Sequence, residues 1–193
     1  MGSKSEIRKQ ILEVRNNLSE EEVKAKSDAI VQKVVKTPEY IEADNILLYA
    51  DYSHEVMTRG IFEDAILHKK KVYFPKTDSL TATMEFYQTV SVKQLQKGYK
   101  GILEPKEDIK YRYIYNTNQD TLVIVPGVAF DTQGYRVGYG KGYYDKYLAN
   151  KRQISMIALS YACQIVDEIP YDSYDIKMDK IVTEEIIYSF LRI

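Results

Sequence analysis

The 193-residue sequence has one cysteine, two histidines and no tryptophan, and neither sign of charge is in clear excess. The single cysteine, Cys163, excludes an internal disulfide and a cysteine-based zinc site, as is typical of a protein in a reducing compartment. The histidines, His54 and His68, have no spacing typical of metal ligands. With 27 basic and 28 acidic residues, the overall charge does not favour nucleic acid or an anionic membrane as a partner.

Long hydrophobic runs, internal repeats and low-complexity tracts are also lacking. No apolar segment approaches the length of a membrane span, and the first residues, MGSKSEIRKQ, lack the apolar core of a signal peptide. We therefore expect a cytoplasmic, monomeric protein that acts on small molecules and has no nucleic acid or membrane partner. The length suits one domain with a sizeable core, over residues 1–193.

Helices and strands are expected to alternate along the chain. Capping-box patterns that begin at Ser3 and Ser19 predict two helices, one over about 4–17 and one from Ser19 to about residue 36. Pro38 follows the second helix and interrupts the helical pattern. Further helices are expected over 58–69 and 142–150, and strands over 45–50, 71–75, 83–88, 121–127, 154–161 and 179–185. This alternation predicts an α/β sandwich of three layers with a mainly parallel sheet, and a surface loop over 106–120.

Two basic side chains lie beside the apolar stripe of the first expected helix. The stripe comprises Ile7, Ile11, Val14 and Leu18, and the inward face of the second helix comprises Val23, Ser27, Ile30 and Val34. Lys4 and Arg8 are one turn apart and share a face at the edge of the first stripe, where a side chain can turn into a cleft. The alternative is a solvated surface pair.

Glycine is concentrated in one segment. Four of the nine glycines lie between residues 134 and 142, and the string VGYGKGYYDKYL places Gly138, Gly140 and Gly142 at alternate positions around Lys141. Glycine lets the main chain approach a ligand closely, so successive N–H groups can converge on an anion. The helix that follows adds unpaired N–H groups, while Arg136 and Lys141 add positive charge. The pattern predicts a polyphosphate site; the alternative is a tight strand-to-helix turn with an exposed lysine.

The spacing excludes two known phosphate-binding loops. A P-loop has serine or threonine directly after its lysine, whereas Gly142 follows Lys141 here. A dinucleotide fingerprint needs glycine at the position that Tyr143 occupies.

The longer string VPGVAFDTQGYRVGYGKGYYDKYL, residues 125–148, resembles the signature of the 5-formyltetrahydrofolate cyclo-ligases, also called methenyltetrahydrofolate synthetases. The resemblance extends along the chain through KSEIRKQI, SHEVMT, MEFYQ, GILEP and DIKMDKIVTE. It implies that ATP and 5-formyltetrahydrofolate give 5,10-methenyltetrahydrofolate, ADP and phosphate with Mg²⁺, through phosphorylation of the formyl oxygen and ring closure. It also implies an α/β fold of the type shared with sugar-phosphate isomerases and CoA transferases.

The resemblance implies roles for individual residues. The expected catalytic residues are Lys141, Arg136 and Lys4. The expected ATP-binding residues are Lys4, Arg8, Arg136, Gly138, Tyr139, Gly140, Lys141, Gly142, Tyr143 and Tyr144. The expected folate-binding residues are Arg8, Glu55, Met84, Phe86, Tyr139, Gly140, Lys141, Gly142 and Tyr143. Asp145 and Asp179 are the expected Mg²⁺ ligands.

Each of these roles has a plainer alternative. Glu55 can be an ordinary loop acid, the side chains of Met84 and Phe86 can be core packing, and Asp145 and Asp179 can be caps or surface groups. Some relatives have a basic residue at the position of Tyr139, so this chain would have to use Arg136, Lys141 or Arg8 for that charge.

Two other functions remain open. One is an isomerase or acyl-group transferase on a related α/β fold, with Glu55 or Glu104 as base or nucleophile. The other is a non-catalytic nucleotide-binding module. A glycine segment rich in positive charge and two candidate Mg²⁺ ligands favour the ligase over the isomerase.

Overall fold

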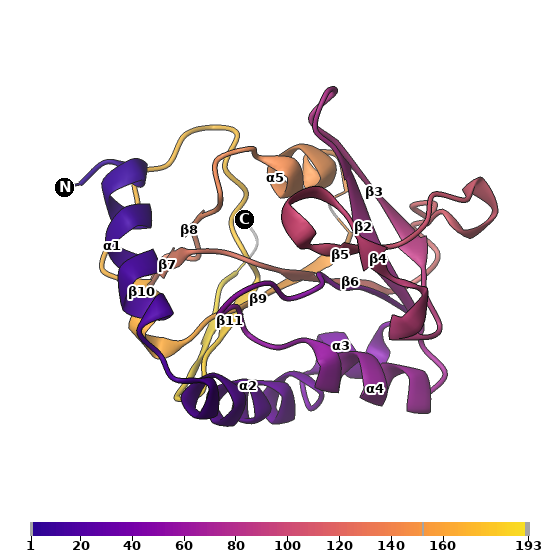
Figure 1. Ribbon diagram of the computed structural model, residues 1–193, viewed down its shortest axis with the longest axis horizontal. Helices are drawn as coiled ribbons and strands as arrows, with labels where there is room; N and C mark the ends of the chain where they lie inside the picture. The colour runs from indigo at the N-terminus through magenta and orange to yellow at the C-terminus, as the bar shows by residue number, and fades with distance from the viewer. Residues whose placement is uncertain (1, 152, 192–193) are drawn as a thin grey trace.

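The computed structural model describes residues 2–151 and 153–191, and its centre is a seven-stranded sheet (Figure 1). Its strands are β1 (Asn45–Leu47), β2 (Lys71–Asp78), β3 (Thr83–Gln88), β6 (Thr121–Val125), β9 (Ser155–Leu159), β11 (Lys180–Val182) and β12 (Ile187–Ser189). They lie in the order β12-β11-β9-β6-β1-β2-β3. The inner strands pair in parallel, whereas β12 and β3 at the two edges pair antiparallel. The α/β class with a mainly parallel sheet is confirmed.

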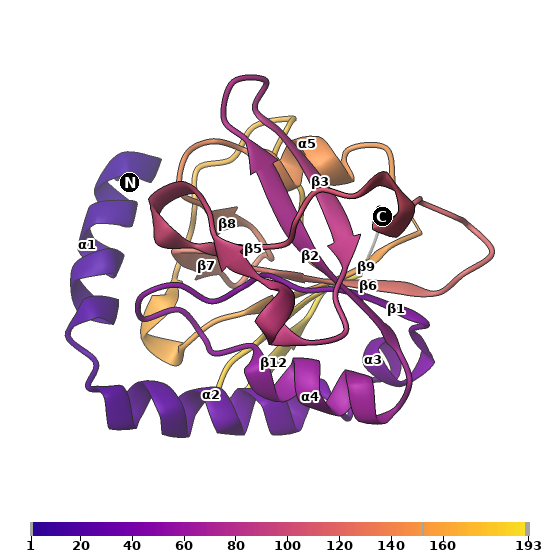
Figure 2. The ribbon, with the colours of Figure 1, turned by 45° about the vertical axis from the view of Figure 1, so that its right-hand side comes forward.

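One face of the sheet is covered by the helices α2 (Glu20–Val34), α3 (Pro38–Glu42) and α4 (Arg59–Leu67) (Figures 1 and 2). All four predicted inward residues of α2 are buried. Pro38 begins α3, where proline is tolerated because N–H groups in the first turn of a helix have no partner within the helix. The Thr37 side chain caps that helix. The helices and the strands bury one continuous apolar cluster that includes Ile30, Ile61 and Ile124.

The opposite face of the sheet packs against a short helix, α5 (Tyr143–Leu148), and a small second sheet. The second sheet contains β7 (Ala129–Asp131), β8 (Arg136–Val137) and β10 (Ile165–Val166). The remaining short elements are the pair β4 (Gln96–Lys97) and β5 (Leu103–Glu104) and the 3₁₀ turns Val92–Gln94, Tyr99–Gly101, Ile109–Tyr111 and Ala162–Gln164. Phe130 from β7 and Leu148 from α5 pack with Val123 of β6, so the molecule has three layers.

Two strands of the small sheet, β7 and β8, lie in the sequence between β6 and the glycine-rich residues 138–142. β7 and β8 form an antiparallel hairpin after β6, and β10 pairs with β7. The sequence did not predict these strands, because two or three residues are too few to show a period. The helix expected over 142–150 is also shorter than predicted, since α5 is only six residues long.

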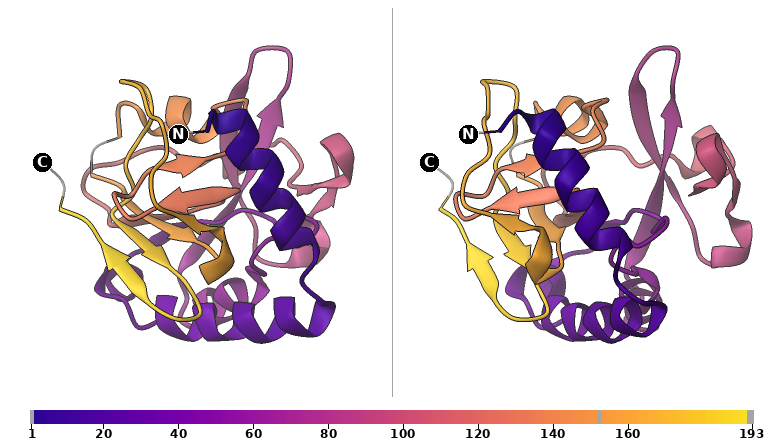
Figure 3. Two further views of the ribbon diagram at one scale, coloured as in Figure 1. Left: turned by 90° about the vertical axis from the view of Figure 1, so that its left-hand side faces the viewer. Right: turned by 60° about the vertical axis from the view of Figure 1, so that its left-hand side comes forward.

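The first helix, α1 (Lys4–Asn16), lies apart from the other helices and crosses the small sheet (Figure 3). Ile7 packs against Ala129 and Val137. The predicted inward position of Val14 is wrong: Val14 is 46% exposed, whereas Arg15 is 2% exposed. Arg15 lies two turns beyond Arg8, so the side of α1 that faces the glycine-rich chain passes through it rather than through Val14.

The predicted surface loop over 106–120 is confirmed with one exception. Most of its residues are exposed, but Tyr113 is buried, and its hydroxyl lies 2.9 Å from Thr121 Oγ1. Among the helices that the structure describes, none has the length and apolar character needed to cross a bilayer.

Candidate functional site

The glycine segment, residues 138–142, connects β8 to α5 and has an unusual backbone. Gly140 and Gly142 have φ angles of +96° and +65°, in the left-handed region that favours glycine. Gly138 has no positive φ, and a Cβ atom there would meet no described atom within 4 Å. The glycines at 140 and 142 therefore turn the chain, while the one at 138 leaves the surface open.

The backbone N–H groups of this segment are available to bind an anion. Within residues 2–151 and 153–191, the N–H groups of residues 138–142 donate no hydrogen bond to the protein. The side chain of Lys141 is exposed and forms no ion pair with any described residue. Backbone N–H groups without partners beside a free ammonium group form a site that a phosphate can satisfy.

The predicted basic residues of α1 lie beside the glycine segment. Arg8 Nε donates a hydrogen bond to Gly138 O at 2.8 Å, and Arg8 Nη2 lies 3.7 Å from the place that a Cβ atom at Gly140 would occupy. Lys4 pairs with the carboxylate of Asp175. Arg8 is thus turned into the site, as its position at the edge of the packed face predicts.

Arg136 is held in an ion pair. Its side chain is almost fully buried, and Nη2 donates to Asp145 Oδ1 at 2.9 Å while Nη1 donates to Ile176 O at 3.2 Å. Asp145 Oδ1 also accepts from the Ile176 N–H at 3.2 Å. These bonds fasten β8, α5 and the chain at Ile176 to one another. The catalytic role predicted for Arg136 stays a prediction, because its charge is neutralised by Asp145 in this structure.

Glu55 lies in the loop after β1 and is only 7% exposed. Its Oε1 accepts a hydrogen bond from the Tyr139 hydroxyl at 2.7 Å, and its Oε2 accepts from the Tyr52 N–H at 3.0 Å. Burial raises the pKa of Glu55 above the usual value, and this outweighs the two hydrogen bonds and the positive charge of Arg15, which lower it. The structure therefore brings Glu55 to the glycine segment as a carboxylate buried against Tyr139.

Arg15 also contacts Tyr139, and no motif in the sequence singles it out. Its Nη2 donates to the Tyr139 hydroxyl at 3.0 Å, and its Nε and Nη1 are buried without a partner among the described residues. The available signal was the spacing: Arg15 lies seven residues after Arg8, two helical turns along the same face.

Two residues predicted to bind folate are in the core. Phe86 is fully buried, and its ring centroid lies 5.0 Å from that of Tyr147 and 6.4 Å from that of Tyr144. Met84 is 5% exposed. The plainer alternative of core packing thus describes both residues in this structure, because both point to the inner side of β3. Tyr143 and Tyr144 are half-buried beside the glycine segment, and the Tyr144 hydroxyl is a further buried group with no described partner.

The two aspartates predicted to bind Mg²⁺ have different surroundings. Asp145 is next to the glycine segment, and its Oδ2 accepts no hydrogen bond from the described part of the chain. Asp179 lies near the start of β9, where its Oδ2 accepts a hydrogen bond from the Met156 N–H at 2.7 Å. Glu55 lies beyond the opposite end of β9, where its backbone carbonyl accepts a hydrogen bond from the Tyr161 hydroxyl. The described residues contain no group of three or more His, Cys, Asp or Glu side chains placed to hold a metal. Mg²⁺ commonly takes one or two carboxylates with phosphate oxygens and water, so Asp145 fits that role.

Comparison with known proteins identifies the family of this chain. A sequence model of the 5-formyltetrahydrofolate cyclo-ligase family matches residues 1–184. The chain belongs to this family. A probable 5-formyltetrahydrofolate cyclo-ligase of Schizosaccharomyces pombe is 32% identical, with 94% of this chain and 95% of that protein covered.

Solved structures of cyclo-ligase family members have the same fold. The 5,10-methenyltetrahydrofolate synthetase of Aquifex aeolicus superposes with a TM-score of 0.82 at 33% identity, over 98% of this chain and 93% of that one. The synthetase of Mycoplasma pneumoniae gives a TM-score of 0.74 at 27% identity, over 95% and 99% of the two chains. Family membership makes the chain an enzyme and disfavours a non-catalytic binding module.

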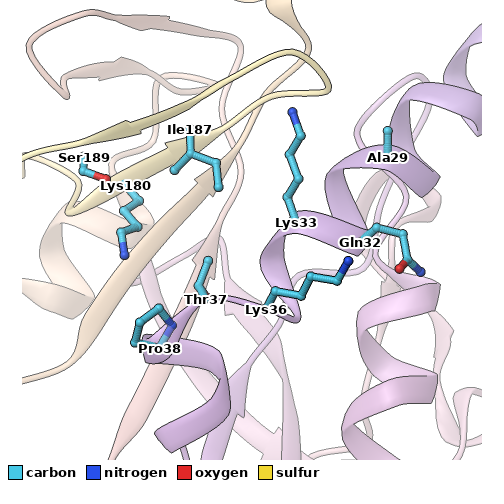
Figure 4. Close-up of a pocket in the computed structure, with 9 residues that line it drawn as sticks. All are labelled: Ala29, Gln32, Lys33, Lys36, Thr37, Pro38, Lys180, Ile187 and Ser189. Carbon is cyan, nitrogen blue, oxygen red and sulfur yellow. The ribbon is translucent and has the colours of Figure 1, made fainter.

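Two other features involve none of the residues described above for the glycine segment. Glu104, the alternative base, forms an ion pair with Lys76 at 2.9 Å between β5 and β2. A groove lies between α2 and the β11–β12 edge, lined in part by Lys33, Lys36 and Lys180 (Figure 4). Lys33 donates to backbone carbonyls and Lys180 pairs with Glu39, so two of its three lysines stabilise the fold.

Proposed function

We propose that this member of the cyclo-ligase family converts 5-formyltetrahydrofolate into 5,10-methenyltetrahydrofolate, with ATP converted to ADP and phosphate. The observation that carries the proposal is the glycine segment: its consecutive N–H groups have no partner among the described residues, and they lie beside the ammonium group of Lys141, which pairs with no described acid. Such a surface suits the β- and γ-phosphates of a nucleotide.

The chemistry accounts for the residue types. The formyl oxygen is a poor leaving group, because the formyl carbonyl is amide-like. Attack of this oxygen on the γ-phosphorus releases ADP and forms a formyl phosphate ester. The second nitrogen of the folate then bonds to the formyl carbon, phosphate leaves with the oxygen, and the nitrogen loses its proton. Both steps need charge neutralisation and alignment more than a strong acid or base.

The cationic residues divide between the two substrates. Lys141 and the N–H groups of residues 138–142 are the proposed groups that neutralise the transferred phosphoryl group, and Arg8 extends the positive surface along α1. The role of Lys4 stays a prediction, because its charge is paired with Asp175 in this structure. Arg8 is held on Gly138 O, and it is the proposed contact for both nucleotide and folate. Arg136 supports the start of α5 through Asp145.

Glu55 is the proposed contact for the pterin of the folate. A carboxylate can accept two hydrogen bonds from the amide and amino edge of the ring. Tyr139 and Tyr143 are the proposed aromatic neighbours of that ring. Met84 and Phe86 support the site from the core, where Phe86 packs against Tyr144.

Mg²⁺ is the proposed metal, and Asp145 is its proposed carboxylate ligand beside the glycine segment. The ion would supply further charge neutralisation at the phosphates when bound. Asp179 stays a prediction as a second ligand, because its Oδ2 accepts a hydrogen bond from the Met156 N–H near the start of β9.

Asp145→Asn is expected to raise the Mg²⁺ concentration needed for half-maximal activity, by about tenfold for the loss of one charged ligand. The measurement is a Mg²⁺ titration of turnover at saturating ATP and folate. Because Asp145 also pairs with Arg136, the melting temperature is measured in parallel, and Asp172→Asn, on the exposed chain near Tyr174, is the control. An unchanged titration would contradict the assignment.

The direct assay for the function follows the near-UV absorbance of the methenyl product. Protein, 5-formyltetrahydrofolate, Mg²⁺ and ATP are expected to form product with one ADP released per turnover. No product is expected when ATP is left out. Product without ATP, or ATP binding without turnover, would refute the proposal and favour an isomerase-type or binding-only protein respectively.

A further inference from the structure

We infer that Arg15 and Tyr139 position the carboxylate of Glu55 for the folate, through a chain of hydrogen bonds from α1 to the loop after β1. The inference rests on the proposed function only in naming folate as the group that Glu55 meets. The Arg15–Tyr139–Glu55 chain consists of two bonds, from Arg15 Nη2 to the Tyr139 hydroxyl at 3.0 Å and from that hydroxyl to Glu55 Oε1 at 2.7 Å.

The direction of donation along the Arg15–Tyr139–Glu55 hydrogen bonds is fixed. A guanidinium group can only donate, so the Tyr139 oxygen accepts from Arg15 and its single hydrogen goes to Glu55. Donation from a charged group polarises the hydroxyl and strengthens its own bond to the carboxylate. Tyr139 thus offers Glu55 a directed donor, which a freely rotating hydroxyl would not provide.

The backbone beneath Glu55 is held separately. The Tyr161 hydroxyl donates to Glu55 O at 3.1 Å, and the Tyr49 hydroxyl donates to Val56 O at 2.8 Å. With the main chain fixed, the direction of the carboxylate depends on its own two bonds, to the Tyr52 N–H and to Tyr139. One of these two bonds therefore comes from the glycine segment, so nucleotide site and folate site share a residue.

Arg15 is placed at a cost to stability. It is 2% exposed, and Nε and Nη1 have no partner in the described chain. A buried charge with donors left unpaired destabilises a fold, and an apolar side chain of similar length could fill the same space. Residues that weaken the fold in this way are typical of functional sites, and Arg15 contacts the Tyr139 hydroxyl, which donates to the Glu55 carboxylate.

The Arg15–Tyr139–Glu55 hydrogen bonds affect the ionisation of Glu55. Only the carboxylate can accept two hydrogen bonds from a pterin edge, since a protonated acid presents a donor there. Burial raises the pKa of Glu55, and the nearby charge of Asp51 raises it further, while the bonds from Tyr139 and Tyr52 and the charge of Arg15 lower it. The hydroxyls of Tyr49 and Tyr144 also lie near this carboxylate. Arg15 and Tyr139 therefore offset part of the rise in the pKa of Glu55 that burial causes, which favours the carboxylate.

The first test needs no substrate. The carboxyl carbon of Glu55 is followed by NMR as pH is changed, in the wild type and in Tyr139→Phe, which removes only the hydroxyl. Loss of a donor raises the pKa of an acid, so the Glu55 titration is expected to move up by about one pH unit, a tenfold change in ionisation. Tyr174→Phe, at an 83% exposed tyrosine, is the matched control with no shift.

The second test is the pH profile of kcat/KM for 5-formyltetrahydrofolate. Its acid limb requires ionised Glu55, so Tyr139→Phe is expected to move that limb to higher pH by the same amount. On the acid side of that limb the KM for folate rises about tenfold, while the KM for ATP is unchanged. Arg15→Leu gives the same pattern, Arg15→Lys restores most of the wild-type profile, and the Arg15→Leu/Tyr139→Phe double variant is no worse than either single variant.

Each outcome decides. An unmoved Glu55 titration in Tyr139→Phe overturns the inference, and so does an equal rise of the two KM values, which would indicate general damage to the glycine segment. A shifted Glu55 titration in a protein that never forms methenyl product would retain the control of Glu55 by Arg15 and Tyr139 and refute the proposed function.

Discussion

Lys141→Ala is expected to lower kcat about a hundredfold or more while leaving the melting temperature unchanged. The ammonium group is exposed and has no ion pair in the described part of the chain, so its removal takes no contact from the folded protein. Charge on the transferred phosphoryl group grows during the reaction, and a cation placed there stabilises the transition state more than bound ATP. Steady-state kinetics with ATP and folate varied in turn measure the effect.

The matched control for that variant is Lys146→Ala. Lys146 is also an exposed lysine, five residues further along in α5, and it is expected to be dispensable. A Lys141→Ala enzyme with normal kcat and KM would remove Lys141 from the catalytic residues. A similar loss in both variants would show only that positive surface charge matters.

Glu55→Gln is expected to raise the KM for 5-formyltetrahydrofolate between about tenfold and a hundredfold, as a lost charged hydrogen bond predicts. The amide keeps the shape of the side chain but turns one acceptor into a donor, which opposes the N–H groups of the pterin edge. The KM for ATP is expected to stay within about twofold, because the phosphates are held by the glycine segment. The two KM values, measured with the other substrate saturating, give the comparison.

Glu104→Gln is the matched control for Glu55→Gln. Glu104 is also a glutamate with a held carboxylate, but its partner is Lys76, in an ion pair that involves no residue of the glycine segment. It should lower stability slightly and leave both KM values unchanged. If Glu55→Gln bound folate as tightly as the wild type, Glu55 would be an ordinary loop acid.

The main fold could be predicted because its signals are local. Ser3 with Glu6 and Ser19 with Glu22 form capping boxes as predicted, and the run at 83–88 is a strand with the expected bounds. The β7–β8 hairpin could not be predicted, because its strands are too short to carry a period and its stability comes from contacts with α1 and β10.

The site was predictable where backbone chemistry decides and less so where tertiary contacts decide. The glycines at 140 and 142 have a left-handed backbone conformation, which glycine adopts without a steric penalty. Arg15 was missed because an arginine next to an apolar stripe normally faces water, whereas here it is buried and donates to Tyr139, a contact that exists only in the folded chain. Phe86 could not be separated from a ligand-binding aromatic by strand period alone, since both would point to the same side of β3.

The central claim is that residues 138–142 bind the phosphates of ATP beside Glu55. The most direct measurement is a crystal structure with Mg²⁺ and an ATP analogue that cannot transfer its γ-phosphoryl group. The account predicts phosphate oxygens within hydrogen-bond distance of the N–H groups of this segment and of Lys141 Nζ, with Arg8 alongside. Phosphates bound elsewhere, with Lys141 in solvent and the segment merely turning the chain, would contradict it.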